Sequence, residues 1–307
     1  MNTILIHIGC TGPHISSPIP PSHLERCIEQ YRVFNKEDLF ILTDRENIPL
    51  ITPRPGVFVL PLEDYRSDKL ERFDAKFNYT SKEFWNASTA RFFYLENFLR
   101  VHNLHHIVHF ENDVLVYFDI EKYTHVFQQL YPTMATTPCD PDHLTSGFMY
   151  FNNYTALERM NDFFMTVLTQ HGNIETAQKV LHIDMANDMT MMKRFADASG
   201  VVGILPALPF GEVSQGIELF DAIFDGAGWG QYIGGTQTNG PGISYAGHVV
   251  GAFIRAHPEW QVTWQVKDGL RLPYLCNEDK QVKINNLHIH SKNMRLFMSR
   301  ANISEGT

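Results

Sequence analysis

The fold is decided by the stretch His105-His106-Ile107-Val108-His109-Phe110-Glu111-Asn112-Asp113-Val114-Leu115-Val116-Tyr117-Phe118. A mostly apolar run ends in two carboxylates, Glu111 and Asp113, and a second apolar run follows at once. Such a run predicts a buried strand, which places the carboxylates at the edge of a sheet where open α/β folds bind ligands. Carboxylate oxygens suit Mg²⁺ or Mn²⁺, ions that usually complete their shell with substrate phosphates. The alternative interpretation is a solvated turn between two strands.

Strand and helix patterns alternate on the N-terminal side of this stretch. Short apolar runs predict strands at residues 3–9, 38–43 and 57–60. A capping box formed by Ser22 and Glu25 predicts the start of a helix, and residues 81–101 have the spacing of a long helix. Strands separated by helices imply an α/β fold with a mostly parallel sheet and right-handed crossovers.

The second half of the chain is less regular. A strand is predicted at 148–151, helices at 156–169 and 185–198, and an alternating strand at 282–290. Residues 224–247 are rich in glycine. There is no internal repeat, low-complexity tract or obvious linker, so we expect one continuous domain over residues 1–307.

Composition excludes several classes of protein. The chain has 307 residues, of which 44% are hydrophobic and 19% charged, so it can bury a sizeable core and is not a disordered protein. Its formal net charge of −9 argues against a nucleic-acid binder, which would carry a basic face. A phosphorylated small molecule remains compatible with this charge, because a bound metal supplies positive charge locally.

Cysteine use and the N-terminal sequence bear on location. The four cysteines have no metal-ligand spacing and are too sparse for a disulfide scaffold. The first residues lack a signal-peptide pattern, and no apolar stretch approaches the roughly 18 residues of a membrane helix. We therefore expect a cytoplasmic protein without a transmembrane segment, either free or peripheral at a membrane.

Four motifs occur in a recognisable order. They are Ala90-Arg91-Phe92-Phe93, Glu111-Asn112-Asp113, Thr145-Ser146-Gly147-Phe148-Met149-Tyr150-Phe151-Asn152 and His288-Ile289-His290-Ser291-Lys292. This order resembles nucleotide-sugar-dependent glycosyltransferases of the type A (GT-A) fold, especially glycogenin-like ones. The resemblance implies transfer of a sugar from a nucleotide diphosphosugar, most plainly a UDP-sugar, to a glycan or another hydroxyl acceptor. It also implies an Mn²⁺ or Mg²⁺ cofactor, a nucleotide-binding part at about 1–118 and an acceptor-binding part at about 119–307.

The metal ligands implied by the resemblance are Glu111, Asp113 and one late histidine. Because Glu111 replaces the aspartate of the family motif and is one methylene longer, Asp113 is expected to bind directly and Glu111 through water. His288 and His290 have the same parity on the predicted strand, so both would face one side. We prefer His290 as the ligand because it is nearer to Lys292. The family's Lys-Pro-Trp is absent here, which leaves the histidine assignment open by two residues.

The resemblance also assigns residues to the nucleotide and phosphates. Lys292 would meet a phosphate as a point charge. Arg91 would contact the donor sugar or diphosphate, with a structural ion pair as the alternative. The base and ribose would lie near the ends of the first two strands, and the donor-binding set is Ile8, Gly9, Asp44, Arg91, Asn112 and Lys292. For Asp44 a turn cap is an equal alternative.

Two further groups of residues are expected around the reacting sugar. Asp184 is predicted to cap the helix at 185–198, and Asp188, one turn in, to act as a general base or to accept a sugar hydroxyl. Both are retained as catalytic candidates. Sugars pack on aromatic faces and bond to carboxylates, so the acceptor set is Asp225, Trp229, Gln231 and Tyr232, with a packed turn as the alternative.

Two other functions compete with glycosyl transfer. A sugar nucleotidyltransferase shares the metal site but usually has an early basic glycine-rich loop, and residues 9–21 contain no Lys or Arg. A non-catalytic carbohydrate-binding relative would keep the fold without metal-dependent nucleotide affinity. The donor sugar, the acceptor, the stereochemistry and the oligomeric state stay open.

Overall fold

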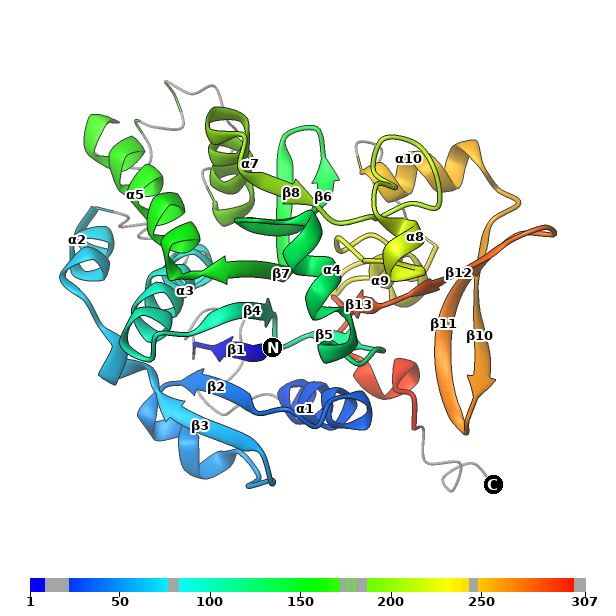
Figure 1. Ribbon diagram of the computed structural model, residues 1–307, viewed down its shortest axis with the longest axis horizontal. Helices are drawn as coiled ribbons and strands as arrows, with labels where there is room; N and C mark the ends of the chain where they lie inside the picture. Colours follow the sequence, from blue (N-terminus) through cyan, green and yellow to red (C-terminus); the bar gives the residue numbers. More distant parts are fainter. Residues whose placement is uncertain are drawn as a thin grey trace.

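The central sheet of the computed structural model has seven strands in the order β3-β2-β1-β4-β7-β6-β8 (Figure 1). Strands β3, β2, β1 and β4 are parallel to one another, β7 is antiparallel to β4 and to β6, and β8 is parallel to β6. The structure describes residues 1–8, 22–76, 83–171, 176, 179, 187–242 and 248–300. The predicted α/β class with a mostly parallel sheet is confirmed.

The strands occupy the following ranges: β1 Asn2–His7, β2 Leu39–Thr43, β3 Val57–Pro61, β4 His105–Phe110, β5 Val114–Val116, β6 Met134–Asp140, β7 His143–Asn153, β8 Val202–Ile204, β9 Ala222–Ile223, β10 Gln261–Lys267, β11 Leu270–Cys276, β12 Gln281–Ile284 and β13 Asn286–His288. The helices are α1 Ser22–Phe34, α2 Asp68–Lys76, α3 Glu83–Val101, α4 Thr124–Leu130, α5 Tyr154–His171, α7 Asp188–Ser199, α8 Ile217–Phe220, α9 Trp229–Gly234 and α10 Val249–Ala256. Short 3₁₀ turns cover Arg45–Leu50, Leu62–Tyr65, Glu121–Tyr123 and Met294–Phe297.

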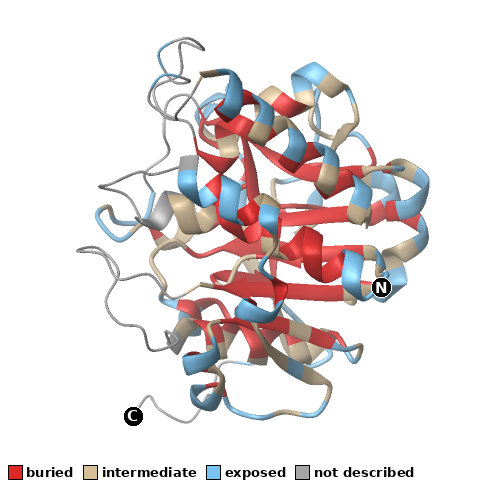
Figure 2. Cartoon of the chain, turned by 90° about the vertical axis from the view of Figure 1, so that its left-hand side faces the viewer, coloured by how far each residue is buried: buried red, intermediate tan, exposed pale blue. Residues whose placement is uncertain are grey.

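The two faces of the sheet pack into two separate cores. Successive strand residues point to opposite faces, so Ile4 and Ile107 join one core while Leu5 and Val108 join the other. Helices α2, α3, α5 and α7 cover the first face, and α1 with the C-terminal segments covers the second. Figure 2 shows the strands as buried and the outer faces of the helices as exposed. Burial on both faces explains why these strands are nearly continuous apolar runs.

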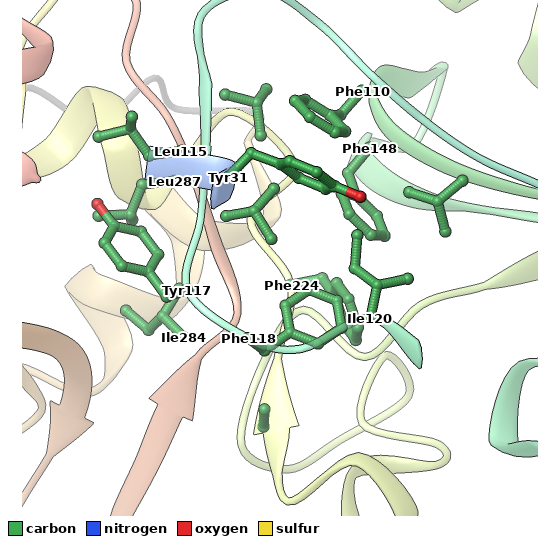
Figure 3. Close-up of a cluster of buried hydrophobic side chains, with 14 of the residues drawn as sticks. Tyr31, Phe110, Leu115, Tyr117, Phe118, Ile120, Phe148, Phe224, Ile284 and Leu287 are labelled. Atoms are coloured by element: carbon green, nitrogen blue, oxygen red, sulfur yellow. The ribbon is translucent and has the colours of Figure 1, made fainter. Parts of the chain in front are cut away.

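The second core brings the end of the chain to the acidic stretch. Strand β5, which directly follows Asp113, pairs antiparallel with β13, and the register places His288 opposite Val114. Leu115 and Leu287 lie opposite each other in this core, which also includes Tyr31 of α1, whose ring stacks on Phe110 (Figure 3). Residues separated by about 175 positions in the sequence are therefore fixed beside one another by a buried apolar cluster.

Most predicted elements agree with the structure, and three differ in their boundaries. The strand predicted at 148–151 extends over His143–Asn153 as β7. The predicted strand at 282–290 is divided at Asn285 into β12 and β13. The N–H of Asn285 donates to the Ile223 carbonyl on β9, and its own carbonyl accepts from the Tyr117 N–H, which follows β5. The helix predicted at 185–198 begins at Asp188. Among the described residues, no helix combines the length and apolar character needed to cross a membrane.

Candidate metal centre

The acidic triplet forms a tight turn at the carboxyl end of β4. The Glu111 N–H donates to Gly147 on β7, and the Val114 N–H donates back to the Glu111 carbonyl at 3.1 Å. The thiol of Cys27 on α1 lies 3.0 Å from the Val114 carbonyl. Bonds from a strand and a helix therefore fix the backbone on both sides of Asp113, which is 4% exposed.

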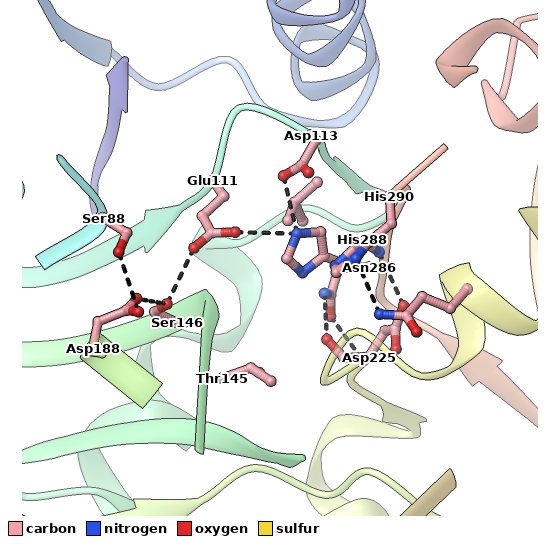
Figure 4. Close-up of polar contacts among 12 residues, drawn as sticks. Ser88, Glu111, Asp113, Thr145, Ser146, Asp188, Asp225, Asn286, His288 and His290 are labelled. Atoms are coloured by element: carbon pink, nitrogen blue, oxygen red, sulfur yellow. Dashed lines mark hydrogen bonds and ion pairs between the residues drawn. The ribbon is translucent and has the colours of Figure 1, made fainter. Parts of the chain in front are cut away.

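His288 closes the site opposite the two carboxylates. Its Nε2 lies 3.1 Å from Glu111 Oε2 and 3.0 Å from Asp113 Oδ1 (Figure 4). The imidazole fits only because residue 147 is glycine: a Cβ there would lie 2.6 Å from His288 Nδ1. The Ser-Gly pair of the third motif thus makes room for the late histidine.

These three side chains form a group with the geometry of a divalent-ion site. Their ligand atoms all lie within 4.8 Å of one another. Adjacent ligands of an octahedral ion with bonds of about 2.1 Å are about 3 Å apart, which is the separation of His288 Nε2 from either carboxylate. The two carboxylates are hard oxygen ligands, and the three side chains leave positions for further oxygen ligands. The residues present could therefore hold a divalent ion.

Cations flank the two carboxylates. Arg91 Nη1 lies 2.5 Å from Glu111 Oε1, and Lys292 Nζ donates to Asp113 Oδ2. Burial alone would raise the pKa of both carboxyls, but Arg91 and His288 outweigh it at Glu111, and His288 and Lys292 outweigh it at Asp113, so both pKa values are held below their usual range. Burial opposes the positive form of His288, yet Asp113 and Glu111 raise its pKa to about 10.

Asp188 lies behind Glu111 and is tied to the same arginine. Its Oδ2 accepts from Arg91 Nη2 at 2.7 Å and from Ser146 Oγ at 2.8 Å, and its Oδ1 accepts from Ser88 Oγ at 3.3 Å (Figure 4). At 2% exposure, Asp188 is a buried partner of Arg91. Arg91 therefore forms ion pairs with Glu111 and Asp188, the structural role that the sequence analysis gave as the alternative to contact with the donor sugar or diphosphate.

The start of α7 corrects the predicted cap. Asn187 is the N-cap residue, with extended backbone angles, and its side chain accepts from the Thr190 N–H at 2.9 Å. Asp188 is therefore the first residue of the helix rather than one turn inside it. Asp184 lies outside the described residues.

Asp225 and Trp229 are core residues, which corrects their assignment to the acceptor. Both are 0% exposed. The Asp225 carboxylate accepts four backbone N–H groups, from Gly228 and Trp229 at Oδ1 and from Gly230 and His288 at Oδ2, over 2.7–2.9 Å. Burial raises the pKa of Asp225, and these hydrogen bonds oppose that rise. Asp225 thus joins the start of α9 to the backbone of His288.

His290 lies beside the metal group without joining it. Its ring contacts that of His288 with centroids 4.3 Å apart, and its Nδ1 lies 3.0 Å from Gln231 Nε2. The preference for His290 as the ligand is therefore revised to His288, because β13 ends at His288 and only that ring enters between the carboxylates. Tyr232, half-buried, lines a separate hollow of about 290 Å³ with Trp260 and other residues.

The residues expected at the nucleotide lie near the ends of β1 and β2. Asn112 Nδ2 is 2.8 Å from His7 Nδ1, so the middle residue of the acidic triplet is bound to the end of β1. Ile8 is half-buried, and Asp44, also half-buried, precedes the 3₁₀ turn at Arg45–Leu50 without a side-chain cap. Gly9 lies outside the described residues.

Sequence reasoning did not single out His7 or the two serines that bond to the site. His7, Ser88 and Ser146 each bond to a predicted site residue. Ser146 stood within a quoted motif, and the strand end could have indicated His7. Ser88 carries no local signal, because its partner is 100 positions away.

Comparison with known proteins gives structural matches only. No protein-family model and no curated protein matches the sequence. Mouse xyloside xylosyltransferase 1, in its apo form, is 11% identical with a TM-score of 0.45, covering 66% of this chain and 84% of that one. Galactosyltransferase LgtC, in complex with donor and acceptor sugar analogs, is 10% identical with a TM-score of 0.41, covering 67% and 73%. The apo WbbM bifunctional glycosyltransferase is 11% identical with a TM-score of 0.38, covering 67% and 38%.

These three structures are named as glycosyltransferases. Those names describe the matched proteins. The function proposed below rests on the side chains of this chain.

Proposed function

We propose that this protein is a glycosyltransferase that uses a divalent ion, Mn²⁺ or Mg²⁺, to move a sugar from a nucleotide diphosphosugar, a UDP-sugar in the first instance, to a hydroxyl acceptor. The observation that carries the proposal is the group of Glu111, Asp113 and His288 at the carboxyl edge of the sheet, with its ligand atoms spaced for an octahedral ion. An ion bound there supplies Lewis acidity toward the leaving diphosphate.

The chain's own residues have separate roles in this proposal. His288 and the two carboxylates would hold the ion, and Lys292 would move from Asp113 to a phosphate oxygen. Arg91, fixed by Asp188 and Ser146, would keep Glu111 in place from behind. We assign Asp188 this positioning role because its two oxygens already accept from three side chains. In the same proposal, residues 1–118 hold the nucleotide and 119–307 shape the acceptor site.

The test is release of nucleoside diphosphate from a panel of nucleotide sugars with Mn²⁺, where slow transfer to water reveals the donor. Asp113→Asn should abolish Mn²⁺-stimulated release while the protein stays folded. Asp142→Asn is the matched control, because Asp142 is exposed in the β6–β7 turn. Equal release by the wild type and Asp113→Asn would refute the proposal, as would a wild type that releases nothing from any donor.

A further inference from the structure

His290 has one ring nitrogen bonded and one buried nitrogen without a partner. Nδ1 lies 3.0 Å from Gln231 Nε2, and an amide NH₂ group donates, so in this arrangement Nδ1 is the acceptor. In a neutral ring the hydrogen then lies on Nε2. This Nε2 is buried and has no hydrogen-bond partner among the described residues. A buried N–H without an acceptor is costly, so this one calls for an explanation.

Close packing against α9 holds the ring in this position. Gly230 and Gly234 face the segment 288–291: a Cβ at Gly230 would lie 2.1 Å from the His288 carbonyl oxygen, and one at Gly234 would lie 3.4 Å from Ser291 Oγ. The two glycines let the helix approach the segment, and Gln231 between them reaches His290. The imidazole is therefore fixed in orientation as well as in tautomer.

The ring of His290 lies next to the ring of the ion ligand His288. It packs against His288 at a tilt of 64° (Figure 4). Two residues later, Lys292 has a left-handed backbone, φ 60°, and its ammonium returns to Asp113. His288, His290 and Lys292 thus supply, in that order, an ion ligand, an N–H donor and a cation.

We propose that His290 Nε2–H donates a hydrogen bond to an oxygen of the diphosphate that the ion at Glu111, Asp113 and His288 carries. The inference rests on the proposed function and adds a residue to it. The four oxygens of Glu111 and Asp113 already face Arg91, His288 and Lys292, so the N–H of His290 needs an oxygen that arrives with the ligand. A phosphate oxygen is an anionic acceptor and makes a short, charge-assisted bond with such a donor. His290 is therefore a diphosphate-binding residue and not an ion ligand.

The experiment compares His290→Phe, His290→Gln and His288→Phe with the wild type by titration calorimetry. The probes are Mn²⁺ alone, UDP with saturating Mn²⁺, and inorganic pyrophosphate with saturating Mn²⁺. His290→Phe should leave Mn²⁺ affinity within about twofold and weaken both diphosphates by on the order of tenfold or more, as expected for a lost bond to a charged group. His290→Gln should restore most of that affinity, because its amide carries an N–H in a similar place. His288→Phe should lose Mn²⁺ itself.

The possible failures are distinguishable. A large Mn²⁺ loss in His290→Phe would make His290 an ion ligand, and unchanged diphosphate affinity would make it a packing residue; either result overturns the inference alone. A wild type that binds neither diphosphate with Mn²⁺ overturns the proposed function and the inference together. If His290→Phe does not fold, ¹⁵N chemical shifts of the wild-type imidazole decide: an Nδ1–H tautomer refutes the reasoning.

Discussion

Replacing Asp225 by asparagine tests how the metal centre is assembled. The four N–H groups that meet the carboxylate come from Gly228, Trp229, Gly230 and His288, all at 2.7–2.9 Å. Asparagine has the same shape, but one of its terminal atoms becomes an NH₂ group. Whichever way the amide is turned, two of the four N–H groups then face a donor instead of an acceptor.

The magnitude follows from that count. Each buried N–H left unpaired costs about 1–3 kcal/mol, so two cost about 2–6 kcal/mol. Relief from burying a charge offsets part of the loss, since burial already raises the pKa of Asp225. We expect a net loss of about 3 kcal/mol in the free energy of unfolding. Because His288 loses part of its support, Mn²⁺ affinity should also fall about 10- to 100-fold.

Urea unfolding and Mn²⁺ titration of the same preparation measure both effects. At a urea dependence of about 3 kcal/mol per molar, the midpoint should fall by about 1 M. Asp221→Asn is the matched control: Asp221 is exposed with φ 47°, a conformation that asparagine adopts readily, so its midpoint should hardly change. An Asp225→Asn midpoint equal to that of Asp221→Asn would show that the carboxylate does not hold α9 and β13 together.

Three further predictions follow from buried contacts. Arg91→Met leaves Glu111 and Asp188 without their shared cation, so the free energy of unfolding should fall by about 3–5 kcal/mol in a denaturant titration. Adding Asp188→Asn to this variant should recover part of the lost stability. Gly230→Ala places a Cβ against the His288 backbone and should lower the melting temperature, whereas Gly240→Ala, with open space around it, should not. Burial lowers the pKa of Lys283 to about 8, below its value in the unfolded chain, so the free energy of unfolding should rise with pH from about 8 to 10.5. Lys283→Met should remove that rise and should raise the melting temperature at pH 7.

The sequence predicted those parts of the molecule that local pattern determines. The strands β1, β2, β3 and β4 were indicated by short apolar runs, and the helices α1, α3 and α5 by helical spacing of apolar residues, because these residues are buried. Glu111 and Asp113 were found because a strand that ends in carboxylates is itself a local signal. The rest of the site depends on contacts between distant segments.

Two misassignments show what local pattern could not supply. Asp225 and Trp229 looked like a sugar-binding loop because glycines, acids and aromatics occur together there. In the fold the acid accepts backbone N–H groups and the indole enters the core, where its Nε1 donates to Ala207. His288 and His290 have equal parity in the sequence, and only the pairing of β13 with β5 decides which ring meets the carboxylates.

The length of Glu111 fits its double role. One oxygen, Oε1, pairs with Arg91 and lies 3.1 Å from Ser146 Oγ, while the other, Oε2, faces His288 at 3.1 Å. A shorter aspartate side chain on the same strand end would have to give up one of these two sides. The extra methylene therefore lets one oxygen of Glu111 face His288 while the other stays paired with a buried arginine. Glu111 stands where the motif that this sequence resembles has aspartate, and Arg91 joins it to Asp188, so these three residues form one unit from the buried start of α7 to the carboxylate pair.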